Sequence, residues 1–263
     1  MCSPPRPPEP ASLPGTATLP PRPIPSPAVH VILVRHGRPE SLVDAPGVAD
    51  PGLDEVGRWQ SERLTAWLAC EDVDAVVTSP KARAIQTAAG LCDLKGLEPR
   101  VVADLDEIDR GARTYLPTEL LPSEGGEYWE MISQKRYDEI GWDTPEAFRD
   151  RVVAAWDDLC RNPPGERVLV ACHGGTIRTV LADVVGNPSA GFRLDYTSIS
   201  RVEVTVPGGP NGEGPADPYC SVASTNETAH FDAERTTVVG AFRGAPRPGA
   251  PPANRPPMTA PTS

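Results

Sequence analysis

The chain has 263 residues and a formal net charge of −11, from 36 acidic and 25 basic residues. This length can bury a full core in one large domain or two small ones. The acidic balance argues against nucleic acid as a partner, because a phosphate backbone demands a basic face, whereas a local arginine cluster can still bind a small phosphorylated ligand. No stretch approaches 18 apolar residues, and prolines interrupt the N-terminal segment. We therefore expect neither a membrane span nor a signal peptide.

Proline is concentrated near the two ends of the sequence. Of the chain's 33 prolines, many lie in residues 4–27 and 246–261. Proline fixes φ and lacks an N–H, and these stretches carry few large apolar side chains that could offset the entropy of ordering. We expect disordered, proline-rich tails at residues 1–27 and 244–263, and one folded domain over residues 28–243.

The six cysteines show no C-x-x-C spacing, and no acidic or Cys/His cluster has the spacing of metal ligands. Their positions are Cys2, Cys70, Cys92, Cys160, Cys172 and Cys220. Buried, reduced thiols in a cytoplasmic protein are the simplest account. We predict no metal site and no cofactor. The pattern of the sequence specifies no oligomeric state.

The first predicted element is a continuous apolar run at residues 29–34 (VHVILV). Such a β-branched run is typical of a strand buried on both faces, as in a parallel sheet. It ends abruptly at Arg35, His36 and Gly37. Ligands of open α/β sheets bind at the carboxyl ends of strands, so this tripeptide indicates a site.

Strands and helices then alternate along the chain. The predicted helices cover residues 54–69 (with Asp54 as N-cap), 81–92, 145–160 and 176–185, and the predicted strands cover residues 73–77, 100–103, 167–172, 199–206 and 219–223. Glycine and proline mark residues 207–218 as a loop and residues 104–142 as irregular, and we expect residues 108–142 to form an insertion over the site. The alternation predicts a three-layer α/β/α domain with a mostly parallel central sheet.

Two further elements end in residues suited to the same chemistry. The strand at 167–172 runs into His173 and Gly174, and Arg83 lies in the first turn of the helix after another strand. If these strands are neighbours, their carboxyl ends bring together two histidines and two arginines. Arginine binds phosphate oxygens through a planar fork. An unprotonated histidine can attack phosphorus, and a protonated one can donate to an equatorial oxygen. The glycines let the backbone approach the phosphate closely.

Several segments resemble, in order, the histidine phosphatase superfamily, which has the phosphoglycerate mutase-like fold. They are LVRHG at 33–37, LDEVGRWQSERLTAWL at 53–68, TSPKARAIQTA at 78–88, LDEIDRG at 105–111, VACHGGTIR at 170–178, TSIS at 197–200 and TNETAHF at 225–231. The resemblance covers about residues 29–231. It implies that this fold extends over nearly all of the predicted folded domain.

The resemblance also implies a role for each matched position. His36 would be the nucleophile, and Glu107 would protonate the leaving oxygen and then help to activate water. The phosphate pocket would be formed by Arg35, Arg83, His173 and Gly174. Asp106 and Asp109 are close rivals of Glu107 for the acid role. The resemblance implies a small phosphorylated substrate.

Some positions depart from the family pattern. Many members carry Asn six residues after the first histidine, where it touches the phosphate. Here that position is Leu42, so either Ser41 substitutes or the contact is absent. The cofactor-dependent mutases follow their catalytic Glu with Arg, but here Ile108 follows, which favours hydrolysis over transfer to a second substrate. Arg38 adds positive charge beside the site and either contacts substrate or points to solvent.

Three hypotheses follow. The first is a phosphomonoester hydrolase that works through a phosphohistidine on a small phosphorylated metabolite or a phosphoprotein. The second is a phosphoglycerate mutase-type phosphotransferase, in which Lys135 and Arg136 would reach a second anionic group. The third is a non-catalytic module that binds a phosphorylated ligand, with tails that dock SH3-like partners. Four aromatic residues of the insertion either form a lid or pack it onto the domain: Tyr115, Tyr128, Trp129 and Tyr137.

Overall fold

The computed structural model describes residues 28–206 and 216–231. The two predicted proline-rich tails lie outside the described residues, as do residues 207–215 of the predicted loop and residues 232–243 of the predicted domain. Within the described ranges, no helix is both long and apolar enough to cross a membrane.

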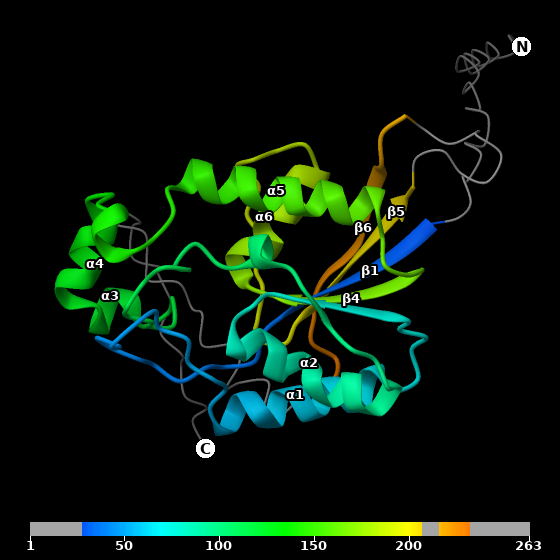
Figure 1. The fold of residues 1–263 in the computed structure, drawn as a ribbon, viewed down its shortest axis with the longest axis horizontal. Coiled ribbons are helices and arrows are strands. Elements are labelled where there is room, and N and C mark those ends of the chain that lie inside the picture. The colour runs from blue at the N-terminus through cyan, green and yellow to red at the C-terminus, as the bar shows by residue number, and fades with distance from the viewer. Residues whose placement is uncertain (1–27, 207–215, 232–263) are drawn as a thin grey trace, which may run out of the picture.

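A single six-stranded sheet forms the centre of the fold, with the strand order β3-β2-β4-β1-β5-β6 (Figure 1). The strands are β1 (Ala28–Arg35), β2 (Ala75–Thr78), β3 (Arg100–Val101), β4 (Arg167–Cys172), β5 (Ile199–Thr205) and β6 (Tyr219–Glu227). β3, β2, β4 and β1 are parallel to one another, whereas β5 is antiparallel to both β1 and β6. The mostly parallel sheet predicted from the sequence is thereby confirmed.

Helices cover both faces of this sheet, with α1 and α2 on one side and α5 and α6 on the other (Figure 1). The helices are α1 (Glu55–Leu68), α2 (Ala82–Lys95), α3 (Leu121–Glu124), α4 (Gly126–Ser133), α5 (Pro145–Arg161) and α6 (Gly174–Val184), with the 3₁₀ turns η1 (Ala103–Leu105) and η2 (Asp138–Ile140). The Asp54 carboxylate caps α1 by accepting from the Gly57 N–H at 2.7 Å, as predicted. These layers make the α/β/α arrangement.

Three helices differ from the sequence-based expectation. The segment 104–142 was predicted to be irregular, yet it contains α3 and α4. Its helix α4 spans only eight residues, too few for apolar spacing to distinguish a helix from irregular structure. Helix α6 begins at Gly174 rather than at residue 176, directly after His173. The two glycines that open it have low helix propensity, which hides its start in the sequence.

Strand β1 is buried on both faces, and this burial fixes the position of the residues that follow it. Ile32 and Val34 pack in the cluster under α1 and α2, whereas Val31 and Leu33 pack in the cluster under α5 and α6. All four are at most 3% exposed. Burial of a side chain of this size contributes about 1.5–3 kcal/mol. The strand is therefore held firmly up to its last residue, Arg35.

The backbone just after β1 is fixed by both helices on that face. A Cβ at Gly57 would overlap the Arg38 carbonyl oxygen, and one at Gly37 would lie 2.7 Å from the Gly57 carbonyl oxygen. The Arg38 N–H donates to Gln60 Oε1 at 2.8 Å, and the Gly37 N–H donates to Thr87 Oγ1 at 2.9 Å. Only glycine fits this close approach between the β1–α1 connection and α1.

The five cysteines in the described ranges are all free. Cys92, Cys160 and Cys172 are buried as expected, but Cys70 is exposed and Cys220 is half-buried. Cys70 differs because it lies two residues beyond Leu68, the last residue of α1, outside the helix face that packs on the sheet. The Cys160 and Cys220 Sγ atoms lie 3.8 Å apart, in a contact between α5 and β6.

Candidate active site

A cavity of about 610 Å³ opens beside the ends of β1 and β4. Five of the six predicted site residues line it: Arg35, His36, Arg83, Glu107 and Gly174. The sixth, His173, contributes no surface to the cavity. It is completely buried behind His36, with the two ring centroids 5.1 Å apart in an edge-on arrangement. The structure therefore brings all six together, as the strand endings indicated.

His36 is held as a neutral ring with one free nitrogen. Its Nδ1 lies 2.8 Å from the Gly37 carbonyl oxygen. Because a carbonyl oxygen can only accept, Nδ1 carries the proton and Nε2 keeps a lone pair. Burial, together with the charges of Arg83 and Arg35, lowers the pKa of His36 well below its usual value. This is the protonation state that a nucleophilic histidine needs.

Arg83 is a buried cation that lacks hydrogen-bond partners. Its side chain is fully buried, and none of its three guanidinium nitrogens has a partner among the described residues. Asp109 Oδ1 lies 3.6 Å from Nη2, and the guanidinium carbon stacks 4.4 Å from the centre of the Tyr115 ring. Burying an unbonded charge is costly. Such a group in a cavity wall is suited to an anionic ligand.

Arg35 is held from two sides. Its Nη1 donates to the Leu194 carbonyl at 2.8 Å, and its guanidinium carbon lies 3.9 Å from the centre of the Tyr196 ring. The Tyr196 hydroxyl in turn donates to Glu119 Oε1 at 2.7 Å. The Nε of Arg35 is buried and has no partner in the described ranges. Both arginines of the pocket are thus stacked on tyrosine rings.

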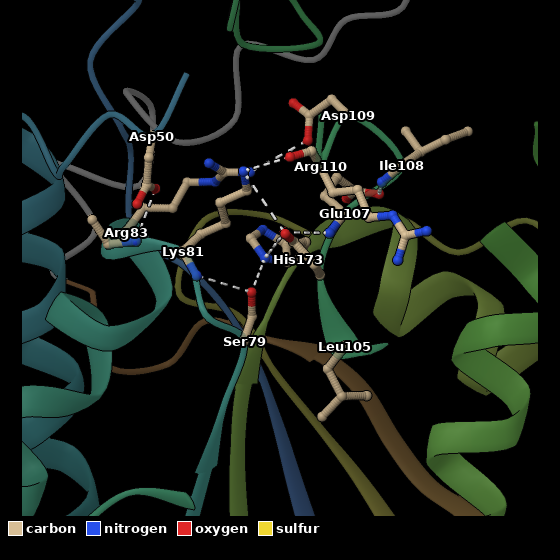
Figure 2. A network of polar contacts seen from close by, with 12 residues as sticks. Asp50, Ser79, Lys81, Arg83, Leu105, Glu107, Ile108, Asp109, Arg110 and His173 are labelled. Atoms are coloured by element: carbon tan, nitrogen blue, oxygen red, sulfur yellow. Dashed lines mark hydrogen bonds and ion pairs between the residues drawn. The ribbon is translucent and has the colours of Figure 1, made fainter. Parts of the chain in front are cut away.

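His173 is positioned by side chains from other elements (Figure 2). Its Nε2 lies 2.6 Å from Ser79 Oγ, at the end of β2, and 3.5 Å from Asp106 Oδ1. Its Nδ1 is buried without a partner among the described residues. Burial, followed by the charge of Arg83, lowers the pKa of His173 well below its usual value. The ring is therefore neutral, with one N–H, rather than the protonated donor that the sequence suggested.

Glu107 is placed to hold and release a proton. Its Oε2 accepts from the Gly175 N–H at 2.8 Å, and its Oε1 accepts from the Ile108 N–H at 2.9 Å. A Cβ at Gly175 would overlap this carboxyl group. Burial, followed by the negative charge of Asp109, raises the pKa of Glu107. A raised pKa favours the protonated form of the carboxyl group, which is the form that a general acid uses.

The two rival carboxylates are engaged elsewhere. Asp106 does not line the cavity, and its two oxygens face His173 and Lys81, whose Nζ is 3.8 Å from Oδ2. Figure 2 shows Lys81, Ser79 and His173 joined in this one network. Asp109 lines the cavity but is paired with Arg83. Among the three acidic residues, Glu107 alone combines exposure to the cavity with a carboxyl group free of a cationic partner.

Apart from Ile108, which lines the cavity, the residues discussed as departures from the family pattern lie outside it. Leu42 pairs through its backbone with Tyr115, and its side chain is exposed. Ser41 is exposed as well and is not part of the cavity wall. The Nε of Arg38 lies 2.5 Å from Asp54 Oδ2, at the N-terminus of α1, and the side chain is 37% exposed to solvent. Neither Ser41 nor Arg38 is placed to contact a bound phosphate.

The insertion contributes to the cavity in part. Its Tyr115 and Trp142 line the wall, whereas Tyr128, Trp129 and Tyr137 do not. The Trp142 Nε1–H donates to the Tyr128 hydroxyl at 2.6 Å, which ties two of the insertion's aromatic residues together. Lys135 and Arg136 also lie away from the cavity, and Arg136 is paired with Glu139. The basic pair considered for a second phosphate therefore does not reach the site.

Comparison with known proteins agrees with the geometry. The family model described as the histidine phosphatase superfamily (branch 1) matches residues 31–210. The chain belongs to this superfamily. A probable phosphatase of Schizosaccharomyces pombe is 27% identical over 221 residues, covering 78% of this chain and 97% of that protein. A 2,3-bisphosphoglycerate-dependent phosphoglycerate mutase of Azorhizobium caulinodans is 32% identical over 163 residues, covering 57% and 79%.

Solved structures of the superfamily share the fold. A putative alpha-ribazole-5'-P phosphatase from Escherichia coli aligns with a TM-score of 0.60 at 21% identity, covering 76% of this chain and 97% of that one. A phosphoserine phosphatase from Entamoeba histolytica aligns with a TM-score of 0.54 at 22% identity, covering 76% and 98%. At this identity the likeness shows the phosphoglycerate mutase-like fold, while the phosphatases among the relatives support phosphatase activity in general.

Metal ligands are not clustered in the described part of the chain. Within residues 28–206 and 216–231, no group of three or more His, Cys, Asp or Glu side chains is arranged to hold an ion. The phosphate pocket instead combines two of the cavity's arginines, Arg35 and Arg83, with the N-terminus of α6, where backbone N–H groups can bind an anion. These cationic and dipolar groups suit a phosphate.

Proposed function

We propose that this chain is a phosphomonoester hydrolase that acts on a small phosphorylated metabolite through a phosphohistidine at His36. One observation carries the proposal: the Arg83 guanidinium, which has no hydrogen-bond partner among the described residues, shares a cavity with a neutral His36 whose Nε2 is free. The cavity's volume of about 610 Å³ falls in the range of small-molecule sites, which favours a metabolite over a phosphoprotein. Phosphatases among the relatives support the same chemistry.

In the first step, His36 displaces the leaving group. Arg35 and Arg83 bind the phosphoryl oxygens and neutralise their charge. His36 Nε2 attacks phosphorus as the ester P–O bond breaks, and Glu107 gives its proton to the leaving oxygen. The Gly37 carbonyl accepts from Nδ1–H and so stabilises the positive charge that develops on the ring. Behind the nucleophile, the Ser79 hydroxyl donates to His173 Nε2, so the one N–H of His173 is on Nδ1, which has no partner among the described residues and donates to an equatorial oxygen.

In the second step, water discharges the phosphohistidine. Glu107 is now a carboxylate, and it accepts a proton from a water molecule that attacks phosphorus. The P–N bond breaks, His36 recovers its lone pair, and inorganic phosphate leaves. The residue after the acid, Ile108, presents an apolar side chain to the cavity. An apolar side chain offers no contact for a second phosphate, which favours water as the acceptor.

The test is phosphate release from p-nitrophenyl phosphate by the wild type and by His36→Ala. We expect His36→Ala to lose turnover and the wild type to form an acid-labile, alkali-stable phosphoenzyme. His30→Ala is the matched control, because His30 lies on the same strand with about half of its side chain exposed, and it should retain activity. Turnover retained in His36→Ala would contradict the mechanism. Interconversion of 2- and 3-phosphoglycerate that outpaces phosphate release would instead select a mutase.

A further inference from the structure

The loop that carries Glu107 lies outside the regular helices and strands. It follows the 3₁₀ turn η1 and leads into the insertion. Its backbone carbonyls therefore need hydrogen-bond donors from other parts of the chain. The carbonyls of Asp104, Asp106 and Glu107 all accept from a single side chain, that of Arg151 on α5.

Arg151 makes five hydrogen bonds, as many as its guanidinium has N–H groups. Its Nη1 donates to the Asp104 and Asp106 carbonyls at 2.8 and 2.9 Å, and its Nη2 donates to the Glu107 carbonyl at 3.2 Å. Its Nε and Nη2 also donate to Asp143 Oδ2, at 3.1 and 2.7 Å. The side chain is 8% exposed and is not part of the wall of the catalytic cavity. Arg151 therefore contacts the loop rather than a ligand.

Asp143 holds the same loop from the insertion side. It lies directly after the insertion, and its backbone N–H donates to the Ile108 carbonyl at 2.8 Å. Its Oδ1 accepts from Arg110 Nε at 3.1 Å, while its Oδ2 accepts from Arg151. The backbone is thus fixed at Glu107 itself and at the residues on either side of it. A shift of this backbone would move the Glu107 carboxyl group with it.

We infer that Arg151, held in turn by Asp143, is the positioning residue of the general acid, which keeps the Glu107 carboxyl group within reach of the leaving oxygen; this inference rests on the proposed phosphatase function. A general acid must lie within hydrogen-bond distance of the atom that it protonates. Helix α5 is a firm support for this contact, because the neighbouring Val152 is completely buried in the core. Arg151 thereby connects the core of the domain to the proton donor.

A double-mutant cycle between positions 151 and 107 tests the inference. Arg151→Gln keeps a polar side chain but cannot make the five hydrogen bonds. Because a misplacement of about 1 Å can cost about 10²-fold, we expect kcat/KM on an alkyl phosphate to fall about tenfold to a hundredfold. On p-nitrophenyl phosphate, whose leaving oxygen needs less help from an acid, the loss should be several-fold smaller. In the Glu107→Gln background, Arg151→Gln should cause no further loss on the alkyl phosphate, because the acid that it positions is already absent.

Arg161→Gln is the matched control. It removes another arginine of α5, whose partners Asp157 and Asp217 lie outside the wall of the catalytic cavity. It should keep the rates on both substrates. Equal losses on the two substrates in Arg151→Gln, or a full additional loss in the Glu107→Gln background, would overturn the inference, because both are expected of a residue that only supports the fold.

Asp143→Asn gives a second, milder form of the test, and a thermal melt of each variant measures folding separately. Asp143→Asn removes the charge that pairs with Arg151 but keeps the backbone hydrogen bond to Ile108. We expect a smaller loss that is again larger on the alkyl phosphate than on p-nitrophenyl phosphate. If Arg151→Gln does not fold, equal losses in Asp143→Asn would overturn the inference. Failure of the proposed function is recognised separately, by turnover that persists in His36→Ala.

Discussion

Two regions of the molecule use the same local design for different tasks. In each, a buried strand of the sheet ends in a histidine followed by glycine: β1 runs into His36 and β4 into His173. His36 reaches the cavity, and its tautomer is set by the carbonyl of the next residue. His173 is completely buried and depends on Ser79 and Asp106, which come from elsewhere in the chain. The strand ending places a histidine, but its partners decide what the ring can do.

The largest expected effect comes from removing the nucleophile, His36. His36→Ala removes the attacking nitrogen, so no phosphoenzyme can form. We expect no labelled protein after a brief incubation with a ³²P-labelled phosphomonoester and a quench in alkaline detergent, in which a phosphohistidine survives. Covalent label in this variant would show that another side chain is the phosphoryl acceptor.

Loss of the second histidine should have a smaller effect of a different kind. His173→Ala removes one hydrogen-bond donor to the transferring group, and removing such a donor costs about 10²–10³ in rate. We expect kcat to fall by this amount while the phosphoenzyme still forms. Rapid-quench labelling distinguishes slow formation from none. Equal labelling defects in the two variants would contradict the division of tasks between His36 and His173.

The contribution of Glu107, the general acid, to the rate should grow with the basicity of the leaving oxygen. Glu107→Gln keeps the size of the side chain but cannot give up a proton. For an alkyl phosphate, whose leaving oxygen is strongly basic, we expect kcat/KM to fall by about 10² or more. For p-nitrophenyl phosphate the loss should be several-fold smaller. A loss of the same size on both substrates would point to Asp109, the other carboxylate in the cavity wall, as the acid.

His36 and Glu107 together set the dependence of activity on pH. Because the pKa of His36 is lowered, the nucleophile stays unprotonated, and active, well below pH 6.5, and activity falls only when acid protonates it. Because the pKa of Glu107 is raised, the proton donor persists above pH 4.5, and activity on alkyl phosphates falls as rising pH removes that proton. We expect a bell-shaped kcat/KM profile whose alkaline limb disappears in Glu107→Gln. An unchanged alkaline limb would reject this assignment.

The smallest effect concerns a positioning residue. Ser79→Ala removes the 2.6 Å contact to His173 Nε2 while leaving the ring in place. We expect kcat to fall about tenfold or less, in line with about 0.5–1.5 kcal/mol for a neutral hydrogen bond. Ser79→Thr, which restores a hydroxyl, should recover most of the rate. If the loss matched that of His173→Ala, Ser79 would be placing the ring rather than adjusting it.

The reacting groups could be predicted because they lie at the ends of strongly patterned elements. His36 follows a strand with buried residues on both faces, and Arg83 opens the helix after β2. The stacking of Tyr196 on Arg35 joins residues that are distant in the chain, so no local pattern reveals it. Tyr115 was noted only as a candidate lid, although it lies beneath Arg83.

The close contact between Gly37 and Gly57 separates two ways in which this protein can fail. A side chain at position 57 would displace the backbone beside Arg38, so its first consequence is a lower yield of folded protein. A change at His36 removes the nucleophile while leaving the contacts of the sheet in place. A screen that scores abundance and turnover independently would therefore place Gly57 with the architecture and His36 with the chemistry. The two glycines would remain necessary even in a copy of the chain that had lost its nucleophile.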